Sequence, residues 1–251
     1  MEPTLIWILV SVLGGFVLAL LLGRGLVPAL RALKAGQSIR EVGPKWHQGK
    51  AGTPTMGGVV FILSSLLCIV TGWHAMRETG DYKHLLVLAL ALMFGLIGFA
   101  DDFIKVKKKR NLGLTGLQKL VLQVLAACLF LAGMHFTNAL TYDLYIPFVR
   151  EPLVHIPPLV YLALSVFIIV GCVNAVNLTD GIDGLATGVT LPVMLFFTLV
   201  SMTAKQWGLA TFPATLVGAL GGFLFYNFYP AKTFMGDTGS LYLGGARPDQ
   251  D

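Results

Sequence analysis

The chain has 251 residues, of which 55% are hydrophobic and only 12% are charged, and its mean hydropathy is +0.75. This composition excludes an ordinary soluble domain, because the helices of a soluble bundle would each carry a charged face. The net charge of +5 is spread unevenly along the sequence, and we predict an integral membrane protein.

Seven long runs without Asp, Glu, Lys or Arg follow one another along the chain. Roughly 20 apolar residues span the ~30 Å hydrocarbon core, so each run predicts one transmembrane helix. The runs are 3–23, 51–76, 84–100, 120–142, 152–179, 184–204 and 206–231. The sequence therefore predicts an all-α, polytopic membrane helix bundle that forms a single domain over residues 1–251.

The first run is expected to stay in the mature protein. Glu2 precedes it and Arg24 follows it, which reverses the charge order of a cleavable signal. All three cysteines fall inside apolar runs and the five histidines are scattered, so neither a disulfide framework nor a zinc site is predicted.

Basic residues divide unequally between the two faces that seven alternating helices create. Thirteen Lys and Arg lie on one face, among them the 107–110 run, and four lie on the other. By the positive-inside rule the N-terminus is predicted outside and the richer face cytoplasmic. Five of the six acids on that face stand at helix ends, where desolvation of a carboxylate is costly, which indicates a functional role.

The first motif is KAGTPTMGG over residues 50–58. Thr53 is predicted to cap the second helix, with Pro54 at its first helical position. Free backbone N–H groups there, together with Lys50 and the Thr55 hydroxyl, would suit an anionic group. The alternative is an ordinary capped membrane helix whose glycines permit close packing.

The second motif is GFADDFIK over residues 98–105. The adjacent carboxylates of Asp101 and Asp102 repel each other, which favours a shared cation or a nearby Lys. Lys105 lies one turn from Asp101 and can supply part of that positive charge.

The third motif is NAVNLTDGIDGL over residues 174–185, where the fifth predicted helix ends and the sixth begins. Four oxygen-bearing side chains recur in steps of three residues: Asn174, Asn177, Asp180 and Asp183. On one straight helix the first and last would face opposite ways, so their convergence on a ligand or Mg²⁺ needs a break, which Gly181 and Gly184 permit.

The fourth motif is FMGDTGSL over residues 234–241. Gly236 lets the backbone come close to a ligand, Asp237 offers a hard oxygen to a cation, and Phe234 offers a flat apolar face for a base ring. An ordinary turn would also explain the Gly-Asp-Thr-Gly sequence. The four motifs together favour Mg²⁺-assisted phosphoryl chemistry on a partly lipidic substrate, and no P-loop is present.

In their order and spacing the four motifs resemble the polyprenyl-phosphate N-acetylhexosamine-1-phosphate transferases, also grouped as glycosyltransferase family 4. The first and third motifs are most similar to the branch that transfers phospho-N-acetylmuramoyl-pentapeptide. The resemblance implies an inner-membrane enzyme of bacterial peptidoglycan synthesis. Its substrates would be UDP-N-acetylmuramoyl-pentapeptide and undecaprenyl phosphate, its products lipid I and UMP, and its cofactor Mg²⁺. A homodimer is a further expectation, and no nucleic-acid partner is expected.

The resemblance also implies residue roles. Asp237 would bind Mg²⁺, and Asp101 and Asp102 would lie close to the metal and the phosphates. Whether any acid acts as a base stays open, since the lipid phosphate is already ionised and positioning is expected to matter more. The remaining implied site residues are Lys50, Lys105, Thr55, Asn174, Asn177, Asp180 and Gly236, with Asp183 and Phe234 against the uracil.

The C-terminal end departs from the resemblance, which implies ten helices and a later His-rich loop. Here Gly245 is followed by Ala246–Asp251. We therefore expect a truncated or frameshifted chain whose eighth helix is a stub, with little or no transferase activity for residues 1–251. The alternatives are a related N-acetylglucosamine-1-phosphate transferase, a transporter, which would place its polar groups near the bilayer midplane, and an inactive scaffold.

Overall fold

The computed structural model describes residues 3–33, 52–77, 80, 82–108, 112–140, 142–144, 154–155 and 157–246. Its helices are α1 (Pro3–Ala32), α2 (Val59–Ser65), α3 (Leu67–Met76), α4 (Lys83–Lys108), α5 (Gly116–Phe136), α6 (Pro158–Thr179), α7 (Leu185–Thr203), α8 (Trp207–Asn227) and α9 (Gly236–Gly245). Two short antiparallel strands, β1 (Asp143–Leu144) and β2 (Val154–His155), lie between α5 and α6.

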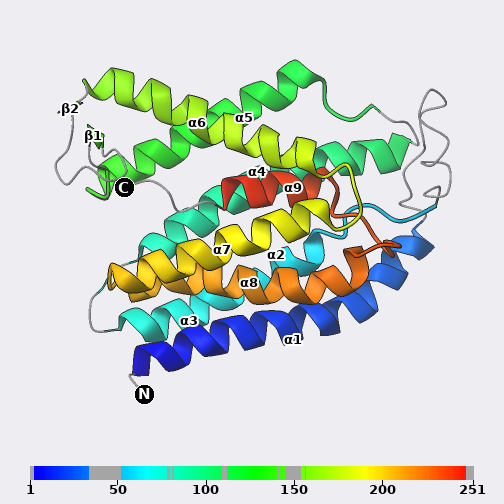
Figure 1. Ribbon diagram of the computed structural model, residues 1–251. Helices are drawn as coiled ribbons and strands as arrows, with labels where there is room; N and C mark the ends of the chain where they lie inside the picture. Colours follow the sequence, from blue (N-terminus) through cyan, green and yellow to red (C-terminus); the bar gives the residue numbers. More distant parts are fainter. Residues whose placement is uncertain are drawn as a thin grey trace.

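Six helices of the described part are long and apolar enough to cross a membrane: α1, α4, α5, α6, α7 and α8. They correspond to six of the seven charge-free runs, which confirms the prediction of a multi-pass membrane helix bundle. The long helices run side by side, and the N-terminus lies at the end opposite the α8 to α9 connection (Figure 1).

The second predicted helix differs from its expectation in two ways. It starts at Val59, with Gly58 as the N-cap, so Thr53 and Pro54 lie before the helix and do not cap it. It is also interrupted at Leu66, which separates α2 from α3. The Ser64 and Ser65 hydroxyls donate to the carbonyls of Val60 and Ile62, and such back-bonding bends helices.

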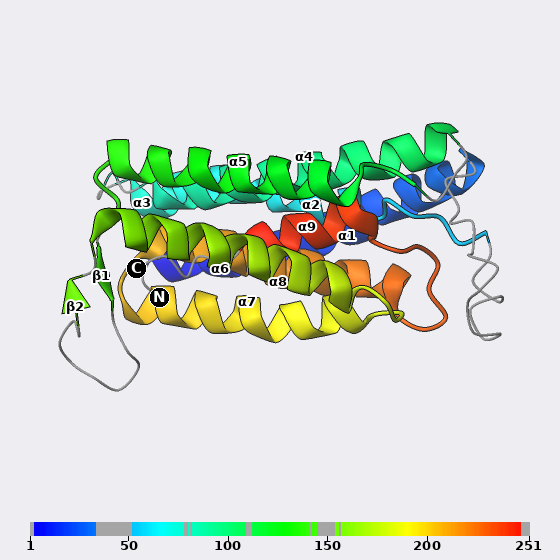
Figure 2. The ribbon, with the colours of Figure 1, turned by 90° about the horizontal axis from the view of Figure 1, so that it is seen from above.

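Helix α9 lies inside the bundle, packed against α4 and α6 (Figures 1 and 2). Leu241, Tyr242 and Leu243 are fully buried, and the Tyr242 hydroxyl shares a 2.5 Å hydrogen bond with Ser65 of α2. The burial of α9 fixes its first turn, which carries Asp237, against the neighbouring helices.

Candidate active site

Three carboxylates from two helices meet at one end of the bundle. Asp101 and Asp102 lie near the C-terminal end of α4, and Asp237 lies in the first turn of α9. One oxygen from each lies within 4.8 Å of the others. The approach depends on Gly98, because a Cβ there would collide with the backbone of Asp237 and Thr238.

Two lysines lie among these carboxylates. The Nζ atom of Lys105 lies 2.5 Å from Asp101 Oδ2, 2.9 Å from Asp237 Oδ2 and 3.7 Å from Asp102 Oδ1. The Nζ atom of Lys119 lies 2.6 Å from Asp237 Oδ2 and 3.6 Å from Asp101 Oδ2. We call these five residues the acid–lysine cluster, whose formal charge is one negative unit.

Lys119 was not predicted as a site residue. It comes from α5, whose start is fixed by a reciprocal cap in which Thr115 Oγ1 accepts from Gln118 N and Gln118 Oε1 accepts from Thr115 N. One signal in the sequence points to it: Lys119 is the only Lys or Arg between residues 111 and 149 and lies in the first turn of a helix that has no other Asp, Glu, Lys or Arg.

Further hydrogen bonds hold the three carboxylates. Asp101 Oδ1 accepts from the Leu114 N–H at 2.7 Å, and Asp102 Oδ2 accepts from the N–H and the hydroxyl of Thr238. Asp237 Oδ1 accepts from the amide of Asn177 at 2.8 Å. Both α4 carboxylates are almost completely buried, whereas the Asp237 side chain is 18% exposed. Asp237 is therefore the acid of the cluster most open to a ligand.

The electrostatic environment keeps Asp237 ionised. Partial burial alone would raise the pKa of this carboxyl. A hydrogen bond with Asp101 and the charges of Lys105 and Lys119 outweigh burial and hold the pKa of Asp237 well below its usual range. Asp237 therefore offers a negative oxygen at any physiological pH.

Thr55 lies beside the cluster, but the helix start with free N–H groups that the sequence predicts around it is not formed. Gly57 and Gly58 do not present free N–H groups to an anion, because these groups donate to the carbonyls of Phe234 and Met235. Gly236 has a φ of 70°, and a Cβ on it would lie 2.5 Å from Asp102 Oδ2 and 2.6 Å from Thr55 Oγ1. Residues 54–58 and 233–236 therefore lie together beside the acids. Lys50 falls outside the described residues.

The third motif is broken as predicted, since α6 ends at Thr179 and Gly184 has a φ of 73°. Its side chains do not all converge on the cluster, however. Asn177 contacts both Asp237 and Ser240 of α9.

The side chains of Asn174 and Asp183 in that motif have partners outside the cluster. Asn174 donates to Gln123 Oε1 on α5, and Asp183 Oδ2 accepts from the Ala231 N–H. Asp180 follows the last residue of α6 and donates its own N–H to the Asn177 carbonyl. Phe234 is half-buried beside the cluster, between Thr233 and Met235.

Comparison with known proteins identifies the family of the chain. The profile of glycosyl transferase family 4 matches residues 84–247, and signature 1 of phospho-N-acetylmuramoyl-pentapeptide-transferase matches residues 50–62. The phospho-N-acetylmuramoyl-pentapeptide-transferase of Bacillus subtilis (strain 168) is 47% identical over 239 residues, which cover 95% of this chain and 72% of that protein.

Two further enzymes of the same name show similar agreement. That of Carboxydothermus hydrogenoformans is 46% identical over 94% of this chain and 73% of its own length, and that of Clostridium acetobutylicum is 45% identical over 95% and 73%. The family profile covers most of the chain, and the matched regions contain all four motifs and the whole acid–lysine cluster. The chain therefore belongs to glycosyl transferase family 4 and, within it, to the phospho-N-acetylmuramoyl-pentapeptide transferases.

Proposed function

We propose that the chain transfers phospho-N-acetylmuramoyl-pentapeptide from its UDP carrier to undecaprenyl phosphate, giving lipid I and UMP. The observation that carries the proposal is the acid–lysine cluster, in which motif residues of α4 and α9 meet a lysine of α5. Two lysines and ionised carboxylates side by side suit a reaction in which charge moves between phosphate groups.

In the proposed reaction an oxygen of the lipid phosphate attacks the sugar-linked phosphorus of the nucleotide sugar. A new phosphorus–oxygen bond forms, the pyrophosphate bond breaks, and UMP leaves with the bonding electron pair. Lys105 and Lys119 attract the phosphate oxygens and offset the charge that develops on the leaving group. Asp101 and Asp237 hold the two ammonium groups in place through the ion pairs described above.

The donor set fits Mg²⁺. Three carboxylates with oxygens within 4.8 Å of one another supply the hard ligands that this ion prefers, and the Oδ2 atoms of Asp101 and Asp237 already face positive charge, from Lys105 and Lys119. We propose Asp237 as the principal ligand, with Asp101 and Asp102 beside it. When bound, the ion would polarise phosphate oxygens and neutralise part of their charge.

A single substitution tests the metal assignment. The chain spans 72% of the length of the Bacillus subtilis relative, so turnover is measured in a chimera that takes from that relative the part of its length that this chain does not match. We expect Asp237→Asn to remove Mg²⁺-dependent UMP release, since an amide keeps the shape but is a much weaker ligand for a hard cation. Asp143→Asn, in β1, is the control, and near-normal turnover of Asp237→Asn would contradict the assignment.

We also propose a bacterial plasma membrane location, with the acid–lysine cluster on the cytoplasmic side and the N-terminus outside. The asymmetry of Lys and Arg between the two faces supports this orientation. Cysteines introduced as Lys108→Cys and Asp143→Cys into a cysteine-free background should label from opposite sides in intact cells. Labelling of position 108 from outside would refute the orientation.

Assembly as a homodimer remains a prediction.

A further inference from the structure

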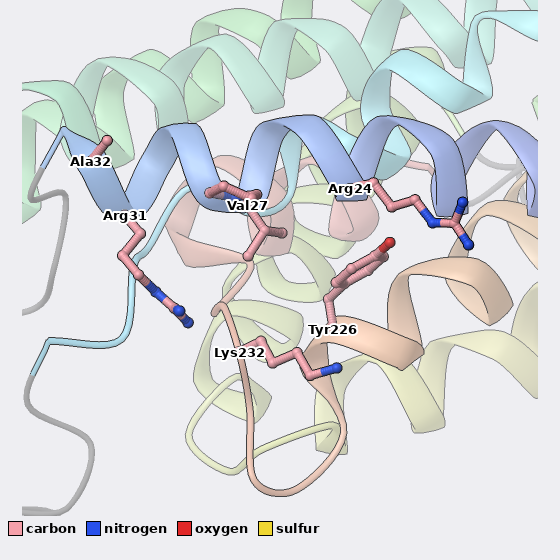
Figure 3. A pocket seen from close by; sticks show the side chains of 8 residues that line it. Arg24, Val27, Arg31, Ala32, Tyr226 and Lys232 are labelled. Carbon is pink, nitrogen blue, oxygen red and sulfur yellow. The ribbon is translucent and has the colours of Figure 1, made fainter.

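A basic pocket opens on the side of the bundle formed by α1 and α8, at the same end as the acid–lysine cluster. Its volume is about 480 Å³. Its lining residues are Gly23, Arg24, Val27, Pro28, Arg31 and Ala32 of α1, Tyr226 of α8 and Lys232 of the α8 to α9 connection (Figure 3). Since no lining residue belongs to α4, α5 or α9, this pocket is separate from the cluster.

The described residues that line the pocket carry positive charge and no negative charge. Arg24 and Arg31 extend from α1, and Lys232 lies across from them on the other wall (Figure 3). All three side chains are exposed, no acid lines the pocket, and no ion pair joins any of them to an acid in the described part of the chain. Three cations around one concavity, without an acid among the described residues that line it, favour an anionic ligand.

The floor of the pocket is formed by the Tyr226 ring, which packs closely against α1. The Tyr226 hydroxyl donates to the Leu20 carbonyl of α1 at 2.7 Å, so the phenol ring is tied to that helix. A Cβ on Gly23 would collide with this ring. The ring therefore rests directly on the α1 backbone and separates Arg24 from Lys232 (Figure 3).

The exposed apolar face of α1 leads directly into the pocket. Six large apolar side chains of this helix face outward: Ile6, Leu9, Val10, Leu13, Val17 and Leu21. At about 100° per residue, these positions and those of Arg24 and Arg31 fall within one arc of about 120° on the helix. A lipid whose acyl chains lie along this stripe would bring its head group to the two arginines.

We propose that this pocket binds the phosphate of an anionic phospholipid, with the acyl chains lying against the outer face of α1. The positive charge explains the preference for an anionic head group, and the continuous stripe explains the preference for a lipid over a soluble anion. The site is distinct from that of the polyprenyl acceptor in the proposed reaction, since the acceptor phosphate has to reach the acid–lysine cluster. The inference does not depend on that reaction.

The test compares two double variants that lose the same charge. Arg24→Gln/Arg31→Gln removes pocket cations, and Lys107→Gln/Lys108→Gln removes exposed cations at the end of α4 that do not line the pocket. Purified chains are titrated in detergent with dioleoyl-phosphatidylglycerol, dioleoyl-phosphatidylcholine and glycerol 3-phosphate, and bound lipid is measured by native mass spectrometry. Unfolding temperatures verify that each variant is folded.

We expect phosphatidylglycerol affinity to fall about fivefold for each pocket cation removed, and thus about 25-fold for the pocket pair. The α4 pair should change it by less than about threefold. If the pocket pair fails to fold, Lys232→Gln, which changes no helical residue, should still lower affinity about fivefold. Equal losses in both pairs would overturn the proposal in favour of unspecific attraction. Equal dependence of glycerol 3-phosphate binding on the pocket cations would overturn it in favour of a soluble anion.

Discussion

The contact between α4 and α9 predicts a large difference between two chemically identical substitutions, Gly98→Ala and Gly133→Ala. A Cβ at Gly98 would overlap the Asp237 carbonyl and crowd the Thr238 nitrogen, whereas nothing lies within 4 Å of a Cβ at Gly133 on α5. Both changes bring the same gain of about 1 kcal/mol in helix propensity. The difference between the variants therefore isolates the overlap.

The overlap is expected to cost about 1–3 kcal/mol, toward the upper end because backbone atoms cannot rotate away as a side chain does. For a chain of this size that corresponds to roughly 2–12 °C in Tm. Helix α9 must move to admit the methyl group, and the Asp237 carboxylate would move with it away from Lys105 and Lys119. A misplacement of about 1 Å can reduce turnover about a hundredfold.

The two variants are compared by thermal unfolding in detergent and by UMP release in the chimera. Gly133→Ala should be as stable as the parent or more stable, with unchanged turnover. Gly98→Ala should lose both stability and turnover. If Gly98→Ala unfolds and turns over as Gly133→Ala does, the close approach of α4 to α9 does not constrain the site, and the geometric argument for the cluster is wrong.

Two further predictions concern the cluster and its support. Lys119→Met should lower UMP release in the chimera about a hundredfold, because one of the two cations that face the phosphates is lost. The control, Lys107→Met, should leave UMP release unchanged. Equal activity of the two variants would show that Lys119 is not part of the site. Ser65→Ala should cost about 1–3 kcal/mol of stability, because it leaves the buried Tyr242 hydroxyl without its hydrogen-bond partner. Adding Tyr242→Phe should restore most of the lost stability, since removal of both partners is nearly neutral. A double variant less stable than Ser65→Ala in thermal unfolding would contradict that reading.

The membrane helices could be predicted because their signal is local. A charge-free run of about 20 residues is sufficient to predict a spanning helix, and six of the seven runs correspond to such helices. The start of the second one depends on a partner far away in sequence. Pro54, Gly57 and Gly58 form backbone hydrogen bonds with residues 234 and 235. Residues 54–58 are therefore paired with that segment and do not start the helix, although the capping residues favour a helix start there.

The three acids that the sequence singles out lie together in the structure, whereas one of the two cations beside them has no signal of comparable strength in the sequence. Asp101, Asp102 and Asp237 can be singled out from the sequence because a carboxylate at a membrane boundary is costly to desolvate, which indicates a functional role. Lys119 has no neighbouring motif, and only the packing of α5 beside α4 brings it to Asp237. The even spacing of Asn174 and Asn177 predicts a shared ligand. The two side chains lie 60° apart on α6, however, so Asn174 contacts α5 and Asn177 contacts α9.

The distribution of contacts within the cluster explains why Asp237 differs from its two partners. Asp101 and Asp102 each accept at least one backbone N–H bond and are buried, so their positions are fixed by α4 and its neighbours. Asp237 accepts no backbone N–H among its described contacts, and its Oδ2 receives both lysines, at 2.9 and 2.6 Å. Lysine side chains are flexible and can withdraw, whereas a backbone N–H cannot. Lys105 and Lys119 contact Asp101 as well, but Asp237 is the one carboxylate of the three that no backbone N–H holds in the described part of the chain, so a ligand can replace its lysine partners with no loss of a backbone hydrogen bond.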